Sequence, residues 1–156
     1  MSSITVKVNN EEETRALGKA IGQKITPPLF IALVGPLGAG KTLISKAIAE
    51  EQDINPEEVT SPTFTIMNIY EGKYNIYHYD FYRLESESEF VDIGVHEFLE
   101  SEDAIVLAEW AEKAQTFFPK DYLQISFDYG EQPTERVITF SARGKKAEEI
   151  LVSLKI

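Results

Sequence analysis

Residues 35–42 read G-P-L-G-A-G-K-T, which is the pattern G-x-x-x-x-G-K-[ST] of a phosphate-binding loop. A polyphosphate presents clustered negative charge, and backbone N–H groups can surround it only where side chains stay out of the way. The three glycines of the motif allow that close approach. Lys41 supplies a positive charge for the β and γ oxygens, and the Thr42 hydroxyl is placed to hold Mg²⁺. The motif therefore predicts a site for a nucleoside triphosphate with Mg²⁺.

The predicted nucleotide-binding set follows this loop into the helix after it: Gly35, Leu37, Gly38, Ala39, Gly40, Lys41, Thr42 and Leu43. Lys41 is also a candidate catalytic residue because its charge would serve the transferred phosphate. Pro36 removes one N–H donor, so later residues must supply most of the donors. The alternative is an incidental glycine-rich turn. The apolar run before the loop and the helical pattern after it argue against that alternative, and the glycine spacing does not fit a dinucleotide-binding G-x-G-x-x-G motif.

A second magnesium ligand is expected from an acidic residue at the end of a neighbouring strand, as in other proteins with this loop. Glu109 follows the apolar run at residues 104–108, and Asp80 ends the segment at residues 74–80. Open α/β sheets bind ligands at the carboxyl ends of their strands. Both acids are therefore candidates, with an ordinary solvated acid at a strand end as the alternative for each.

Other residues give weaker signals. A hydroxyl-rich cluster could contact a γ-phosphate or its Mg²⁺ as a switch segment: Thr60, Ser61, Pro62 and Thr63. From composition alone, a turn with capping hydroxyls is the better interpretation of that cluster. His78 is expected to be a packed histidine rather than a base, and His96 a surface residue or ion-pair partner. Trp110 is expected either beside the nucleotide or in the core, and its size favours the core.

The elements that must position these residues alternate between strands and helices. Strand patterns occur at residues 4–8, 29–34, 64–70, 74–80, 104–109, 123–127 and 137–142. Helical patterns begin at Asn10, where Glu13 completes a capping box, and occur again at residues 41–51 and 144–154. We expect a hairpin around residues 71–72. The pattern predicts an α/β fold: one P-loop NTPase domain over residues 1–156, with a mixed parallel and antiparallel central sheet flanked by helices.

Composition excludes several classes of function. The chain has 156 residues, 15 basic and 26 acidic, and a net charge of −11. This balance argues against a broad grip on a nucleic-acid backbone and against docking on an anionic membrane. The absence of cysteine excludes disulfide scaffolds, thiolate metal sites and cysteine nucleophiles. We see no signal-peptide pattern and no apolar run near the roughly 20 residues that span a bilayer, so a cytoplasmic protein is expected.

Four ordered blocks together resemble the TsaE (formerly YjeE) family, bacterial P-loop ATPases required for the threonylcarbamoyladenosine (t6A) modification of tRNA. The blocks are residues 35–42, S-P-T-F-T at 61–65, H-Y-D-F-Y-R-L at 78–84 and L-A-E-W at 107–110. The resemblance implies ATP or ADP and Mg²⁺ as ligands, with Thr42 and Glu109 on the metal and Asp80 needed for hydrolysis. It also implies a switch-like segment at residues 60–65 and nucleotide contacts at Thr14 and Arg136. Pro36 stands where the family commonly has Asp.

The family's implied task is to drive a cycle of the complex that contains TsaB and TsaD. A net charge of −11 suits docking on partner proteins and not direct high-affinity binding of tRNA. A small-molecule kinase is the alternative, and a module that merely retains nucleotide is a third possibility. Kinases usually need several cationic clamps. This chain has only four arginines, Arg15, Arg83, Arg136 and Arg143, of which Arg83 is best placed to reach a site at Asp80. This shortage predicts slow hydrolysis.

Overall fold

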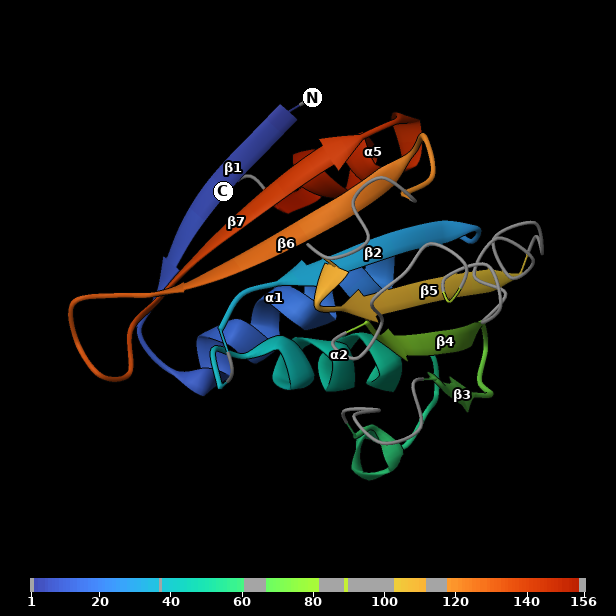
Figure 1. Cartoon of the computed structure of the whole chain (residues 1–156), viewed down its shortest axis with the longest axis horizontal. Coiled ribbons are helices and arrows are strands. Elements are labelled where there is room, and N and C mark those ends of the chain that lie inside the picture. The colour runs from blue at the N-terminus through green and yellow to red at the C-terminus, as the bar shows by residue number, and fades with distance from the viewer. Residues whose placement is uncertain are drawn as a thin grey trace.

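In the computed structural model, seven strands of the described residues form one sheet (Figure 1): β1 (Ser2–Val8), β2 (Leu29–Val34), β3 (Met67–Tyr70), β4 (Asn75–Asp80), β5 (Ala104–Glu109), β6 (Tyr122–Tyr129) and β7 (Arg136–Arg143). The structure describes residues 2–36, 38–60, 67–81, 89, 103–111 and 118–154. The strand order is β1-β7-β6-β2-β5-β4-β3. The four central strands, β6, β2, β5 and β4, are parallel, and the outer pairings are antiparallel. The predicted mixed sheet is confirmed.

The helices among the described residues are α1 (Glu11–Lys24), α2 (Lys41–Glu50), the short 3-10 helix η1 (Pro56–Glu58) and α5 (Lys145–Leu154). Apolar residues of α1, α2 and α5 join one core cluster with the sheet, so these three helices cover the same face: Ile21, Ile44, Ile48, Ile150 and Leu151. A smaller cluster lies on the opposite face and includes Phe30, Tyr79, Phe81 and Val106. No helix of the described ranges is both long and apolar enough to span a bilayer.

The start of α1 is fixed by the N-cap at Asn10 that the sequence predicts, although the Glu13 carboxylate reaches one residue further back than the predicted capping box requires. The Glu13 backbone N–H donates to Asn10 Oδ1 at 2.9 Å, and the Glu13 carboxylate in turn accepts from the Asn9 N–H at 2.7 Å. Three glutamates in the first turn complement the positive end of this helix. The direction in which α1 leaves β1 is therefore set by local side-chain chemistry.

Two glycines allow α1 and α2 to pack closely. A Cβ built on Gly18 would lie 2.7 Å from the Ala47 Cβ, and one built on Gly22 would lie 2.8 Å from the Glu51 Cβ. Real Cβ atoms do not approach so closely, so only glycine fits at these two positions without a shift of the helices. This close packing brings the buried Thr14 of α1 against Gly40, at the start of α2.

Parallel strands with helices on one face bring three chain segments to one edge of the sheet. In Figure 1, β2, β4 and β5 point the same way, toward the loop that leads into α2. Asp80 and Glu109 are the last residues of β4 and β5. The loop and both candidate acids therefore lie at the carboxyl edge of the sheet, where ligands of open α/β folds bind.

Candidate functional site

The loop between β2 and α2 has the backbone that its glycines require. Gly35 has φ +144° because it passes close to β6: a Cβ there would lie 2.6 Å from the Phe127 carbonyl oxygen. Gly38 has φ +79°, yet among the described residues a Cβ there would meet only the Tyr129 hydroxyl, at 4.0 Å. The first glycine is thus needed for close packing against the sheet. The second is needed for its left-handed backbone.

The N-terminus of α2 is arranged differently from that of α1. Its N-cap is Gly40, no side chain caps it in the part of the chain that the structure describes, and no acidic residue lies in its first turn. The first N–H groups of a helix need partners from outside the helix, and the helix dipole makes this end positive. α1 satisfies that need with Asn10 and three glutamates. α2 instead leaves it open to an external anion, and this fits a phosphate group.

Lys41 lies inside the loop, with 5% of its surface exposed. Its Nζ donates to the Gly35 carbonyl oxygen at 2.6 Å and lies 4.2 Å from the centre of the Trp110 ring. Trp110 directly follows β5, has φ +56° and is half-buried against the second core cluster. Trp110 is therefore both a core contact and a neighbour of the loop cation, so the preference for a purely core role was incomplete.

The two candidate acids lie side by side. Asp80 and Glu109 are register partners on the parallel strands β4 and β5, and the Phe81 N–H donates to the Glu109 carbonyl oxygen at 3.0 Å. They are 4% and 3% exposed. Leu107, two residues before Glu109, belongs to the core cluster that also contains Ile44 of α2. Side chains two residues apart on a strand share a face, so Glu109 lies on the face that α2 covers.

His78 is fully buried, and its Nε2 lies 2.6 Å from Glu109 Oε2. The expectation of a packed histidine is confirmed, but its partner was missed from the sequence. The sequence places His78 and Asp80 on one face of β4, because they lie two residues apart, but it does not identify Glu109 as the partner of His78.

The predicted nucleotide contacts Thr14 and Arg136 come together beside the loop. A cavity of about 360 Å³ is lined by the start of α1, the loop and the turn between β6 and β7: Asn10, Glu11, Thr14, Gly38, Ala39, Gly40, Leu43, Pro133, Thr134 and Arg136. The Arg136 guanidinium lies 4.9 Å from the Tyr129 ring, and Nη1 donates to the Pro133 carbonyl at 2.9 Å. A cavity of this size suits the nucleoside part of a nucleotide.

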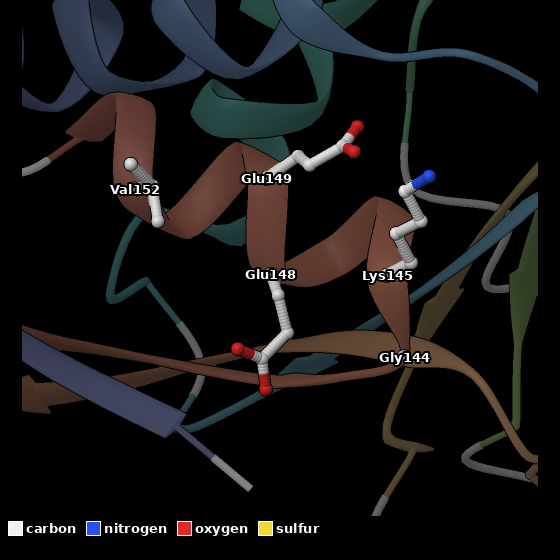
Figure 2. Close-up of a pocket in the computed structure, with 5 residues that line it drawn as sticks. All are labelled: Gly144, Lys145, Glu148, Glu149 and Val152. Carbon is white, nitrogen blue, oxygen red and sulfur yellow. The ribbon is translucent and has the colours of Figure 1, made fainter.

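A larger cavity, of about 570 Å³, lies along α5 and contains none of the predicted residues. Figure 2 shows its lining, with the Glu148 and Glu149 side chains leaving α5 in different directions. Two carboxylates and one lysine make a poor environment for a phosphate, because the like charges repel it. Chemistry therefore favours the smaller cavity at the loop.

The first residue of the predicted switch cluster is anchored to β3. The Thr60 N–H donates to the Tyr70 hydroxyl oxygen at 3.2 Å, and that hydroxyl donates back to the Thr60 carbonyl, also at 3.2 Å. Asn68 Nδ2 donates to the same hydroxyl. Five predicted site residues lie outside the described residues: Leu37, Ser61, Pro62, Thr63 and Arg83.

The donor set fits a magnesium ion that is shared with phosphate. The described ranges contain no cluster of three His, Asp or Glu side chains that could hold a metal without help. Thr42 lies in the first turn of α2, and Glu109 lies at the end of β5, at the same edge of the sheet. Mg²⁺ in phosphate-binding sites uses one or two protein oxygens and completes its shell with phosphate and water. A hydroxyl and a carboxylate beside a phosphate loop meet that requirement.

Comparison with known proteins gives concordant matches. A family model described as "Threonylcarbamoyl adenosine biosynthesis protein TsaE" matches residues 8–138. The chain is 37% identical to the tRNA threonylcarbamoyladenosine biosynthesis protein TsaE of Bacillus subtilis (strain 168), over 99% of this chain and 95% of that protein. It is 36% identical to the protein of that name from Treponema pallidum (strain Nichols), over 74% and 84% of the two chains. The crystal structure of Bacillus subtilis YdiB superposes with a TM-score of 0.79 and 31% identity, over 98% of this chain and 94% of that chain.

Proposed function

The chain belongs to the TsaE family of t6A biosynthesis proteins, and from its site we propose that it binds ATP with Mg²⁺ and hydrolyses it slowly. One observation carries the proposal. The uncapped start of α2, the enclosed Lys41 and the two buried acids at the ends of β4 and β5 all meet at one edge of the sheet. A fold alone has no need to bury two carboxylates beside a phosphate loop.

Each residue has a separate task in the proposed reaction. Backbone N–H groups of the loop and the first turn of α2 bind the phosphates, and Lys41 neutralises charge on the β and γ oxygens. Thr42 and Glu109 would hold Mg²⁺, which would offset negative charge on the phosphates. Asp80 orients the attacking water. Thr14 and Arg136 line the cavity for the rest of the nucleotide.

Slow turnover follows from what surrounds the phosphates. Lys41 is the one cationic side chain of the described residues that we place on them, and an additional arginine is worth several orders of magnitude in related reactions. A slow hydrolase suits a switch, because the ATP-bound form persists long enough to act on a partner. We propose that this partner is the TsaB–TsaD complex and that the chain works there as a nucleotide-dependent switch.

Changing Asp80 to asparagine should separate binding from turnover. The substitution keeps the side-chain volume but removes the charge that orients water, so we expect phosphate release to fall about 100-fold while ATP affinity stays within about threefold. Phosphate release and the fluorescence of Trp110, the only tryptophan, measure the two quantities on the same sample. Loss of ATP binding would instead make Asp80 a structural residue. A phosphorylated small product seen by mass spectrometry would favour the kinase alternative.

The partner proposal predicts nucleotide-dependent association. The chain should co-elute with purified TsaB–TsaD in ATP and Mg²⁺ and should dissociate in ADP, because only the triphosphate fills the γ position of the loop. Raising the salt concentration should weaken the complex, since electrostatic attraction steers a protein of charge −11 to its partner. Size-exclusion chromatography measures both effects. Co-elution with unmodified tRNA alone, without TsaB–TsaD, would contradict the proposed division of labour.

A further inference from the structure

The surroundings of the buried hydrogen bond between His78 and Glu109 indicate which of the two side chains is the donor. Within the described residues, Nδ1 of His78 is buried and has no hydrogen-bond partner, while Nε2 lies 2.6 Å from Glu109 Oε2. A buried N–H donor without an acceptor costs more than a bare ring nitrogen without a donor. The proton is therefore assigned to Nε2, which donates to the Glu109 carboxylate, and Nδ1 is left bare.

We propose that His78 is a positioning residue that fixes the Glu109 carboxylate for the magnesium ion. The hydrogen bond occupies one carboxylate oxygen and leaves the other for the metal. Oε1 has no hydrogen-bond partner of its own in the part of the chain that the structure describes. Partners that hold a ligand from outside the metal shell set its orientation, and their loss typically weakens metal binding 10- to 100-fold. This inference rests on the proposed function, which places Mg²⁺ at Glu109.

The surroundings of His78 hold the ring rigidly enough for this task. On β4 it is the register partner of Leu107, one side-chain step before Glu109 on the same face of β5. The His78 ring centre lies 6.0 Å from that of Tyr70, and the Tyr70 hydroxyl is hydrogen-bonded to the Thr60 backbone. Burial and these neighbours restrict rotation of the imidazole. The carboxylate is thus oriented before the metal arrives, and binding does not have to order it.

A purely structural hydrogen bond is the alternative, and Mg²⁺ affinity separates the two. The test measures the Mg²⁺ concentration that half-saturates the magnesium-dependent part of ADP binding in the full chain. His78→Leu should raise this concentration 10- to 100-fold, and His78→Gln should recover most of the loss because its amide Nε2–H can still reach Glu109. In a Glu109→Ala background, His78→Leu should have no further effect. A purely structural bond would change the melting temperature but leave the magnesium requirement of His78→Leu unaltered.

The direction of the hydrogen bond can be checked without metal or activity. Nitrogen-15 NMR of the nucleotide-free protein should show His78 with its proton on Nε2 and a bare Nδ1. The chain has two histidines, so His96→Gln assigns the signals. A proton on Nδ1 would overturn the proposal even if the His78 variants fail to fold. Wild-type protein whose ADP binding ignores Mg²⁺ would refute the proposed function itself, whereas a magnesium-dependent wild type with an unaffected His78→Leu would refute only this inference.

Discussion

Lys41→Ala is expected to lower ATP affinity about 100-fold and to bring hydrolysis to background. In the proposed site the lysine would serve two phosphate oxygens, and charge-assisted hydrogen bonds of about 1.5–3 kcal/mol each give about 3 kcal/mol at the low end, which corresponds to roughly 100-fold. Its Nζ donates to the Gly35 carbonyl and lies over the Trp110 ring, so these contacts position the cation at the loop. Isothermal titration calorimetry with ATP, together with a phosphate-release assay, measures both losses.

A matched control distinguishes the loss of the Lys41 contacts at the loop from the loss of a positive charge on α2. Lys46 lies on the same helix and is only partly buried, so Lys46→Ala removes an equal charge from α2 without touching the loop. That variant should bind ATP within about threefold of the wild type. Thermal melting of both variants verifies that they fold. Wild-type affinity and turnover in Lys41→Ala would contradict the assignment of residues 35–42 as the nucleotide site.

The loop and the elements around it could be predicted because their signals are local. The apolar run before residue 35, the glycines and the helical pattern after residue 41 fix a strand, a turn and a helix within about twenty residues. The cap at Asn10 is equally local, and the structure has its hydrogen bond from the Glu13 N–H, while the Glu13 carboxylate accepts from the Asn9 N–H and not from the Asn10 N–H that a capping box uses. The sequence pattern places Asp80 and Glu109 at strand ends. Bringing both to the same edge of the sheet needs only parallel strands, and β4 and β5 are parallel.

Features that depend on pairing between distant segments could not be predicted. The contact between His78 and Glu109 spans 31 residues and depends on the exact register of β4 against β5. A shift of one residue would turn His78 to the other face of the sheet. The position of the Trp110 ring beside Lys41 depends on a positive φ that tryptophan rarely adopts, and no sequence pattern predicts this backbone conformation. The tie between Thr60 and Tyr70 is likewise a tertiary contact.

Glu109→Gln is expected to remove most of the magnesium dependence of nucleotide binding. Glutamine keeps the volume and still offers an oxygen that accepts from His78 Nε2–H, so the fold around β5 should persist. It lacks the negative charge that a small, strongly hydrated cation requires of its ligand. We expect the Mg²⁺ concentration for half-maximal ADP binding to rise about 100-fold, while binding measured in EDTA stays at the wild-type value. A titration of Mg²⁺ at fixed ADP, followed by Trp110 fluorescence, gives both numbers.

The comparison that decides the ligand is between the two neighbouring acids. Asp80 and Glu109 are register partners, equally buried and at the same edge of the sheet, so proximity alone does not distinguish them. The His78 hydrogen bond distinguishes the two acids, because it orients Glu109 and not Asp80. Asp80→Asn should therefore keep a wild-type magnesium titration, and Glu148→Gln on α5 controls for the loss of a negative charge elsewhere. If Asp80→Asn shifts the titration and Glu109→Gln does not, the metal belongs to β4, and Glu109 becomes the residue that acts on water.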